Sequence, residues 1–462
     1  MEGLDVTVLR LREVLTDNEK FRIDDGYFAK LPVQTQRRID AMPHARLGTL
    51  CEVFRKGIFD IKADTYANSG VPFVRIGNMN DGLIDDADIA YITPQAHAVE
   101  GATALHYGDL VLSKTAYAAA SFVNVPECNV SQDTIAVRLS SDGAAEFKTG
   151  FIAAYLNCRY GLALMARQFQ GNVQSHLSLP DGRKVAIPKF GPRLQADTDQ
   201  AYRDADAELR AAKEAMKFAE ETLAAGLGLR DWQPPEPLTY TRHASEVFAA
   251  RRLDAEYFAP RVRELLVRLG DSGRTLREVA PPRHENFLPS RTGEFDYIEI
   301  SDVHNDGTAG STRLPECDAP SRATQFVRAK DVITSTVRPI RRLSALIRAD
   351  QAGSVCSSGF VVLEPRAVAP EVLLTYLRLP VVCELMALHT SASMYPAISE
   401  TDLLGLPFPR ISENSERIVA AIQRAHASRR HAHQLLQRAK QAVEIAIERD
   451  ESTALRSLEI PS

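Results

Sequence analysis

The chain has 462 residues, a formal net charge of -5, six cysteines, 45% hydrophobic residues and 25% charged residues. This length exceeds one hydrophobic core and predicts about three domain-sized units, while the acidic balance taken alone argues against a nucleic-acid binder. The scattered cysteines fit neither a zinc ribbon nor a disulfide framework. No apolar run approaches the ~20 residues of a bilayer span, so we expect a cytoplasmic protein without a membrane contact.

Short β-branched or apolar runs, bounded by turn residues, predict strands in both halves of the chain. They lie at 73–76, 110–113, 134–139, 296–300, 332–336 and 360–363. Pro72 is expected just before its strand, where no donor for the ladder is needed. Segments with helical spacing follow at 151–168 and 371–388. Strands first and a helix late do not give the alternation of a doubly wound sheet, so the predicted class is α+β.

Two long helices with heptad patterns are predicted at 195–223 and 413–447. In the first, apolar or small residues alternate in steps of three and four: Tyr202, Ala205, Leu209, Ala212, Met216, Ala219 and Leu223. This is the seam of a coiled coil, and Gly226 and Gly228 end the helix. We expect the two helices to pair with each other. The alternative is that both are ordinary bundle helices packed into separate domains.

The chain contains an internal repeat. The phrase Ile23-Asp24-x-x-Tyr27-Phe28-Ala29 recurs as Leu253-Asp254-x-x-Tyr257-Phe258-Ala259. Further matches join 109–113 to 331–335 and 187–188 to 408–409. The plan is therefore an extended entry, a globular domain and a long helix, twice over. Because each helix leaves its unit at the same point of the repeat, we expect them to pair antiparallel.

These patterns divide the chain into seven parts. They are an N-terminal segment (1–45), a first globular domain (46–190), a central helix (191–228), a proline-rich linker with the second repeat entry (229–272), a second globular domain (273–410), a distal helix (411–450) and a tail (451–462).

Sequence signatures of catalysis are missing. There is no phosphate-binding P-loop, no glycine-rich cradle for a dinucleotide or S-adenosylmethionine, and no Asn-Pro-Pro-aromatic signature of adenine methylation. His426, His431 and His433 include no pair four residues apart that would hold a metal. We therefore expect no catalysis, no cofactor and no metal in this chain.

Three phrases and the duplicated plan carry a resemblance to a known family. The phrases lie at 73–79, 108–114 and 171–177, and with the helix after each unit they resemble the specificity (S) subunit of type I restriction-modification systems over nearly the whole chain. The second half departs from the family at Asp302-Val303-His304 and at 393–396. The resemblance implies two target-recognition domains, each reading half of a bipartite DNA sequence. It also implies an antiparallel coiled coil that separates them and docks two methyltransferase (M) subunits, with restriction (R) subunits as further partners.

Polar or cationic residues just past strand ends or in glycine-rich loops are the candidates for contact with double-stranded DNA, because Arg and Lys suit guanine and Asn and Gln suit adenine. In the first domain they are Arg75, Asn78, Lys114, Tyr117, Gln132, Gln174 and His176. In the second they are His304, Arg338, Arg341, Arg342, Ser358 and Tyr395. The three arginines belong to a basic segment at 321–350 and can grip phosphate. For each, the alternative is a solvated or structural side chain.

The leading hypothesis is a non-catalytic DNA-specificity subunit for an asymmetric, bipartite target. One alternative is the recognition portion of a larger modification or nuclease enzyme. Another is a coiled-coil scaffold without a DNA role, which the negative net charge favours.

Overall fold

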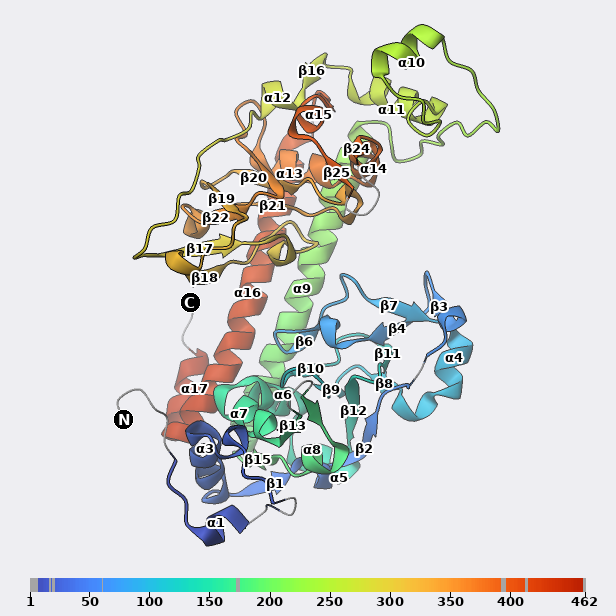
Figure 1. Ribbon diagram of the computed structural model, residues 1–462. Helices are drawn as coiled ribbons and strands as arrows, with labels where there is room; N and C mark the ends of the chain where they lie inside the picture. The colour runs from blue at the N-terminus through green and yellow to red at the C-terminus, as the bar shows by residue number, and fades with distance from the viewer. Residues whose placement is uncertain are drawn as a thin grey trace. The chain divides into compact units, whose positions relative to one another are not determined.

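The computed structural model describes residues 7–15, 18, 21–59, 61–171, 175–391, 396–411 and 414–459. The chain divides into two compact units, which we call unit 1 (Met1–Leu209 with Arg429–Ser462) and unit 2 (Arg210–Ser428). Both contain helices and strands (Figure 1), which confirms the mixed class that the sequence predicts. Within the described part of the chain, no helix combines the length and the apolar character that a bilayer span requires.

Unit 1 contains two larger sheets. The first has the order β2-β12-β9-β10-β6-β5, with bounds Cys51–Lys56, Thr134–Leu139, Leu110–Ser113, Ala120–Phe122, Leu83–Ile84 and Met79–Asn80. The second has the order β3-β7-β4-β11-β8, with bounds Tyr66–Ala67, Ala90–Ile92, Val71–Val74, Glu127–Val130 and Leu105–His106. In the first sheet, β12 pairs antiparallel with β2 on one side and with β9 on the other. The strands β2 and β9 therefore lie on either side of β12.

Helices and short strands complete unit 1. The helices are α1 (Leu11–Leu15), α2 (Asp25–Phe28), α3 (Lys30–Asp40), α4 (Pro94–Val99), α5 (Ser141–Glu146), α6 (Thr149–Asn157), α7 (Arg159–Gln168), α8 (Leu179–Arg183) and α17 (Glu451–Glu459). The short strands pair as β1 (His44–Arg46) with β15 (Ala186–Pro188) and β13 (Phe169–Gln170) with β14 (His176–Leu177). Phe54, Leu112 and Phe151 belong to one buried cluster, so α6 packs on the first sheet.

Unit 2 contains a four-stranded and a three-stranded sheet. The orders are β18-β17-β22-β19 (Thr312–Pro315, Glu294–Ile298, Val355–Ser357, Ala323–Phe326) and β21-β20-β23 (Ser344–Leu346, Val332–Ser335, Phe360–Leu363). Two short pairs are β16 (Arg274–Thr275) with β26 (Pro407–Phe408) and β24 (Thr390–Ser391) with β25 (Ala397–Ile398). Its helices are α10 (Ala244–Ala250), α11 (Pro260–Leu269), α12 (Leu276–Val279), α13 (Pro370–Arg378), α14 (Pro380–Leu388) and α15 (Glu400–Leu404).

Three strands, β9, β12 and β23, have the bounds that the sequence predicts. The expectation for Pro72 was wrong, because this residue lies inside β4, opposite Tyr91 of β7. The pairing of β4 with β11 begins only at Phe73, so no donor is needed from Pro72 on that side.

The single helices predicted at 151–168 and 371–388 are each broken in two. Cys158 between α6 and α7 and Leu379 between α13 and α14 both have extended backbone, with ψ of 164° and 131°. In unit 2 the cause is Pro380, which disfavours helical backbone at the preceding residue. In unit 1 no proline marks the break. There the backbone of Gly161 lies so close to the carbonyl of Tyr155 that a Cβ would meet its oxygen at 2.0 Å.

The long helices are α9 (Pro192–Gly226) and α16 (Ser415–Glu448). Residues of both helices lie in each unit. In unit 1, Tyr202 of α9 and Leu436 of α16 share one apolar cluster, and in unit 2 Ala219 and Ile422 share another. Each unit therefore uses part of both helices to complete its own core.

Candidate nucleic-acid interface

The end of strand β9 is joined to two neighbouring segments of unit 1 by backbone hydrogen bonds. The N–H of Lys114 donates to the carbonyl of Asp133 at 2.8 Å, and the carbonyl of Lys114 accepts from the N–H of Leu177 at 2.8 Å. The N–H of Ala116 donates to the carbonyl of Ser175 at 3.1 Å. We call this arrangement the strand-end framework. It gathers the loop after β9, the turn before β12 and the strand β14 at one end of the sheet.

The same arrangement occurs in unit 2 at the end of β20. The N–H of Thr336 donates to the carbonyl of Gly359 at 2.9 Å, and its carbonyl accepts from the N–H of Ile398 at 3.0 Å. The N–H of Arg338 donates to the carbonyl of Pro396 at 2.8 Å. Thr336 therefore occupies the position of Lys114, and Arg338 that of Ala116.

One position in the framework has left-handed backbone in both units. The φ angle is 65° at Ala116 and 49° at Arg338. Residues other than glycine adopt this conformation at a cost of ~1 kcal/mol. Because an alanine and an arginine share this conformation, the framework and not the side chain sets it.

In unit 1 the framework brings four of the predicted residues to one end of the sheet: Lys114, Tyr117, Gln132 and His176. The ring of Tyr117 is 51% exposed, and His176 is exposed next to Thr115, with which it forms an isolated bridge. These side chains are available to a ligand that lies over the strand ends.

Asn78 has a structural position instead. It is 4% exposed, its Oδ1 accepts from the N–H of Arg75 at 3.0 Å, and its Nδ2 donates to the carbonyl of Asp85 at 3.1 Å. Both ends of the Asn78 amide are therefore used in a buried turn, which favours the structural alternative for this candidate. Arg75 is exposed and donates to the carbonyl of Asp88 at 2.9 Å.

In unit 2 the framework holds Arg338 and places the exposed Ser358 next to Gly359. Arg341 lies exposed in the short 3-10 turn Pro339–Arg341 that follows. His304 is half-buried in a different turn, where its N–H donates to the carbonyl of Thr308 at 2.9 Å. The three bonds of the framework do not include His304.

Arg342 was predicted to contact DNA, but its guanidinium is used inside unit 2. Its Nε donates to the carbonyl of Arg378 at 2.7 Å, and its Nη2 pairs with the carboxylate of Glu220. Two further arginines of the basic segment pair with carboxylates, Arg328 with Glu285 and Arg348 with Asp350. Much of the charge in that segment is therefore neutralised within the unit.

Gln174 and Tyr395, the remaining predicted residues, lie outside the described residues.

Sequence reasoning missed Lys56, the last residue of β2, which stands opposite Ile135 of β12. The signal that would find it is the strand order, because only the pairing of β2 and β9 with β12 brings Lys56 and Lys114 to the same end. Burial and the charge of Lys56 lower the pKa of Lys114, whereas Asp133 acts in the opposite direction.

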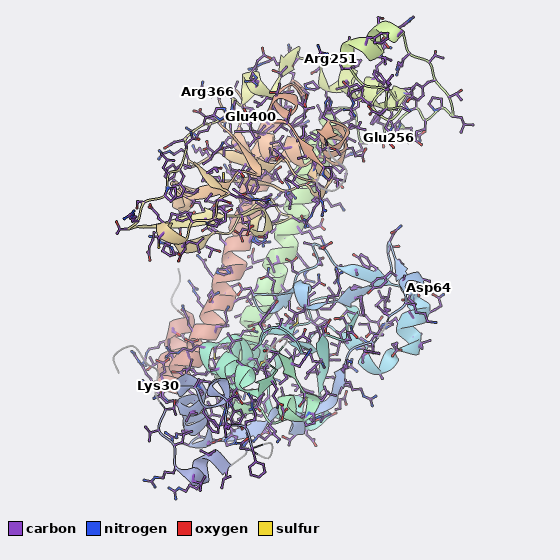
Figure 2. The ribbon with its side chains drawn as sticks, viewed as in Figure 1. Lys30, Asp64, Arg251, Glu256, Arg366 and Glu400 are labelled. Carbon is purple, nitrogen blue, oxygen red and sulfur yellow. The ribbon has the colours of Figure 1, made fainter. Side chains whose placement is uncertain are left out.

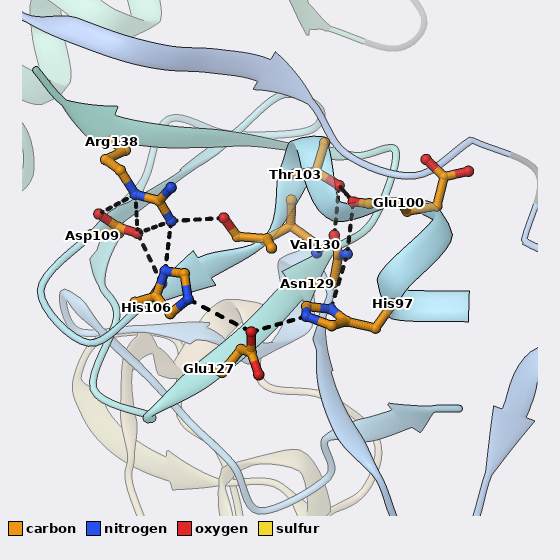
Figure 3. Close-up of polar contacts among 10 residues, drawn as sticks. His97, Glu100, Thr103, His106, Asp109, Glu127, Asn129, Val130 and Arg138 are labelled. Atoms are coloured by element: carbon orange, nitrogen blue, oxygen red, sulfur yellow. Dashed lines mark hydrogen bonds and ion pairs between the residues drawn. The ribbon is translucent and has the colours of Figure 1, made fainter. Parts of the chain in front are cut away.

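A second polar cluster lies on the other sheet of unit 1 (Figure 3). Oε1 of Glu127 stands 3.1 Å from Nε2 of His97 and 3.6 Å from Nε2 of His106, and Nδ1 of His106 meets Nη2 of Arg138 at 2.8 Å. Arg138 in turn pairs with Asp109 at 2.8 Å. The described residues contain no group of three or more His, Cys, Asp or Glu side chains that could hold a metal. The contacts themselves join α4, β8 and β11 and, through Arg138 of β12, connect them to the first sheet.

A cavity of about 540 Å³ lies elsewhere in unit 1, between α2, α3, α7 and α8, and is lined by several basic side chains. The Arg167 Nε donates to the carbonyl of Tyr27 at 2.9 Å, and the guanidinium lies 4.2 Å from the centre of the Tyr27 ring. Arg46 and Arg183 donate to the carbonyls of Lys184 and Phe54. These arginines tie the entry helices to the rest of the unit.

No family model and no curated protein matches the chain. Solved structures similar to it include three from type I restriction-modification systems. The S subunit from M. genitalium is 12% identical, with 91% of this chain and 96% of that chain covered and a TM-score of 0.36. The HsdS subunit from Thermoanaerobacter tengcongensis is 16% identical, with 88% and 97% covered and a TM-score of 0.28.

The third structure concerns the complex assembly and conformational transition of the type I R-M system; it is 17% identical, with 88% and 98% covered and a TM-score of 0.26. Similarities of this size leave the function of the chain to be derived from its own residues.

Proposed function

We propose that this chain is the DNA-sequence specificity subunit of a type I restriction-modification complex, with each unit reading one half of a bipartite, asymmetric target. The observation that carries the proposal is the strand-end framework, which occurs once in each unit with different side chains. Lys114 and Gln132 stand in unit 1 where Thr336 and Ser358 stand in unit 2. Equivalent positions with different polar groups suit two unrelated half-sequences.

The repeat entries give a second match between the units. The Arg22 guanidinium donates two hydrogen bonds to Asp24, at 2.8 and 2.7 Å, and lies 4.5 Å from the centre of the Tyr27 ring. Arg252 makes the same two bonds to Asp254, at 2.8 and 2.7 Å, and lies 4.4 Å from its own tyrosine ring. These equal contacts support a tandem duplication and give the two tyrosines the same structural role.

In the proposed assembly α9 and α16 form an antiparallel coiled coil that spaces the two readers. Supporting contacts in unit 1 are Leu194 in one cluster with Ala446, and Glu208 Oε1 at 3.1 Å from Nδ1 of His431. Higher numbers on α9 thus meet lower numbers on α16. At ~1.5 Å per residue the 35 residues of α9 span ~52 Å, more than the ~34 Å of one DNA turn.

The proposed partners are double-stranded DNA, two M subunits that dock along the coiled coil, and R subunits. A net charge of -5 leaves the chain short of cations for gripping phosphate, so the complex rather than the isolated chain is expected to bind DNA firmly. Chemistry belongs to the M subunits, since the chain has no sequence signature of a cofactor cradle. Purified chain that methylated DNA with S-adenosylmethionine alone would favour the alternative of a modification enzyme.

The test is a map of adenine methylation in cells with and without this gene. The proposal predicts one bipartite motif, with two unrelated halves separated by an unspecified gap, that disappears with the gene. An unchanged methylation pattern would favour the scaffold alternative.

The spacer role has its own test. A heptad inserted between Ala212 and Lys213, with a matching insertion near Leu435, keeps the seam in phase and lengthens α9 by ~10 Å. The methylated motif is expected to keep both halves while its gap grows by about three base pairs, at ~3.4 Å each. An unchanged gap in an active variant would contradict the spacer role.

A further inference from the structure

Lys56 and Lys114 lie on the same face of the first sheet of unit 1, at the same end. Lys56 of β2 and Leu112 of β9 both stand opposite Ile135 of β12, one on each side. Residues opposite each other in a ladder share a face, and Lys114 shares the face of Leu112 because it comes two residues later. Ile135 and Leu112 are buried, so the two lysines stand where the apolar face of the sheet ends.

Their charges are poorly balanced inside the unit. Among the described residues, no carboxylate oxygen lies within 4.0 Å of either ammonium group. The charge of Asp133, at the turn before β12, favours the charged form of Lys114, but burial and the charge of Lys56 outweigh it and lower the pKa of Lys114. An anion placed between the two lysines would relieve their repulsion.

Phe59 lies beside Lys56 and takes no part in the core. Its side chain is 70% exposed, and its ring centre lies 4.3 Å from Nζ of Lys56. The backbone before it is fixed: the N–H of Ile58 donates to the carbonyl of Val130 at 2.8 Å, and a Cβ on Gly57 would meet the carbonyl oxygen of Ser131 at 2.2 Å. A large apolar ring is thus held in solvent next to the Lys56 cation.

Unit 2 does not repeat this pair. Thr336 takes the position of Lys114, and its hydroxyl donates to the carbonyl of Gly359 at 3.0 Å. Pro282 forms an isolated bridge with Leu363 of β23, the strand next to β20. His284, two residues after Pro282, therefore takes the position of Lys56. The Nε2 of His284 lies 3.4 Å from Oε1 of Glu400, which Figure 2 labels. The feature is therefore specific to unit 1.

We propose that Lys56 and Lys114 together hold one backbone phosphate of the DNA half-site bound by unit 1, with Phe59 packed against the neighbouring nucleotide. We call these residues the phosphate clamp. The clamp rests on the proposed function and assigns Lys114 to phosphate rather than to a base edge. It positions the DNA over the strand-end framework, where Gln132 and His176 then meet the bases.

The test measures DNA affinity of the assembled complex against salt concentration. Each phosphate contact contributes about -0.9 to the slope of log K against log salt. The double variant Lys56→Gln with Lys114→Gln is expected to make the slope shallower by about one contact while the methylated sequence stays the same. The control is Lys30→Gln with Lys148→Gln, which removes equal charge from exposed sites on α3 and before α6 and is expected to leave the slope unchanged.

Two more variants separate the clamp from a general loss of folding. Phe59→Ala is expected to weaken binding at least about fivefold at every salt concentration with the slope unchanged, since it removes a stacking surface and no charge. His284→Lys with Thr336→Lys places a clamp in unit 2 and is expected to steepen the slope by about one contact.

The outcomes are distinct. A wild-type complex that shows no specific DNA binding overturns the proposed function and the clamp with it. A wild-type complex that binds specifically, with an unchanged slope in the folded Lys56→Gln and Lys114→Gln double variant, overturns the clamp alone.

Discussion

Units 1 and 2 hold their strand ends with the same backbone hydrogen bonds but carry different side chains there. Lys114 and Ala116 of unit 1 correspond to Thr336 and Arg338 of unit 2. The bonds run between main-chain groups, so they fix where a side chain starts without restricting which side chain it is. One framework can therefore present different polar groups to a ligand, as two different half-sites require.

The two units also differ in the residue that ends α6 in unit 1 and α13 in unit 2. Asn157 at the end of α6 donates to the carbonyl of Ala120 at 2.7 Å. In unit 2 the equivalent residue at the end of α13 is Arg378, which is 2% exposed, donates to the carbonyls of Arg342 and Asn305, and lies 4.0 Å from Glu220. Burial lowers the pKa of the Arg378 guanidinium.

Arg378→Ala is expected to give the largest effect, a loss of ~3 kcal/mol or more in the free energy of unfolding, because the carbonyls of Arg342, Ser344 and Asn305 lose a buried donor and the Glu220 carboxylate loses a nearby positive charge. Asn157→Ala in unit 1 is expected to cost ~1–2 kcal/mol. Urea titrations measure both. The control is Arg366→Ala, which removes an exposed arginine paired with Glu364 and is expected to change stability by no more than ~0.5 kcal/mol. Equal losses of stability at positions 157 and 378 would contradict the larger contribution expected from Arg378.

Smaller and equal effects are expected at the repeat entries. Arg22→Ala and Arg252→Ala each remove a hydrogen bond to a helix-end carbonyl and a contact with a tyrosine ring. Each is expected to cost ~1–2 kcal/mol, with the two values within ~0.5 kcal/mol of each other. Thermal or urea unfolding compares them, and Arg251→Ala, which changes the neighbouring exposed arginine that Figure 2 labels, serves as the control. A large loss in one unit and none in the other would break the equivalence of the entries.

The smallest expected effect concerns Asp81, whose carboxylate meets Nζ of Lys440 and Nδ1 of His433 at 2.7 Å each. Burial raises the pKa of Asp81, but the hydrogen bonds and charges of these two partners outweigh it and leave the pKa below its ordinary value of 3.8. A depressed pKa stabilises the fold above that value, and the stabilisation is lost as pH falls through the folded-state pKa.

Asp81→Asn is therefore expected to cost ~1 kcal/mol at pH 7 and progressively less below about pH 4. The equivalent Asp306 of unit 2 accepts hydrogen bonds from Thr308 and its charge acts on the buried Arg378, so Asp306→Asn is expected to cost at least as much. Unfolding measured across pH tests both. A penalty at position 81 that does not change with pH would show that its charge is not what matters.

Much of the fold can be predicted from the sequence because its signals are local. The strands 110–113, 134–139 and 360–363 and the long helix ending at Gly226 follow from residue type and spacing. The helix breaks show the limit. Pro380 indicates the break before α14 directly. An alignment of the two repeats would have placed a second break at Cys158, where the sequence has no proline and the backbone of Gly161 lies close to the carbonyl of Tyr155.

The candidate site was less predictable, because it depends on which strands lie side by side. Asn78 has the right chemistry for a base contact, but its burial in a turn is set by residues that sequence spacing does not place. Arg342 was chosen for its charge, and the partner that uses this charge, Glu220, stands more than a hundred residues away. Lys56 was missed for the same reason, since its closeness to Lys114 depends on β12 lying between their strands.

The central claim is that each unit reads one half of the target, and methylation maps of two paired variants test it most directly. Gln132→Ala with His176→Ala alters unit 1, and Arg338→Ala with Arg341→Ala alters unit 2, in cells that carry the whole system. We expect each pair to relax or change the bases of one half of the methylated motif and to leave the other half and the gap intact. Both halves changing together, or neither changing in either folded variant, would contradict the account.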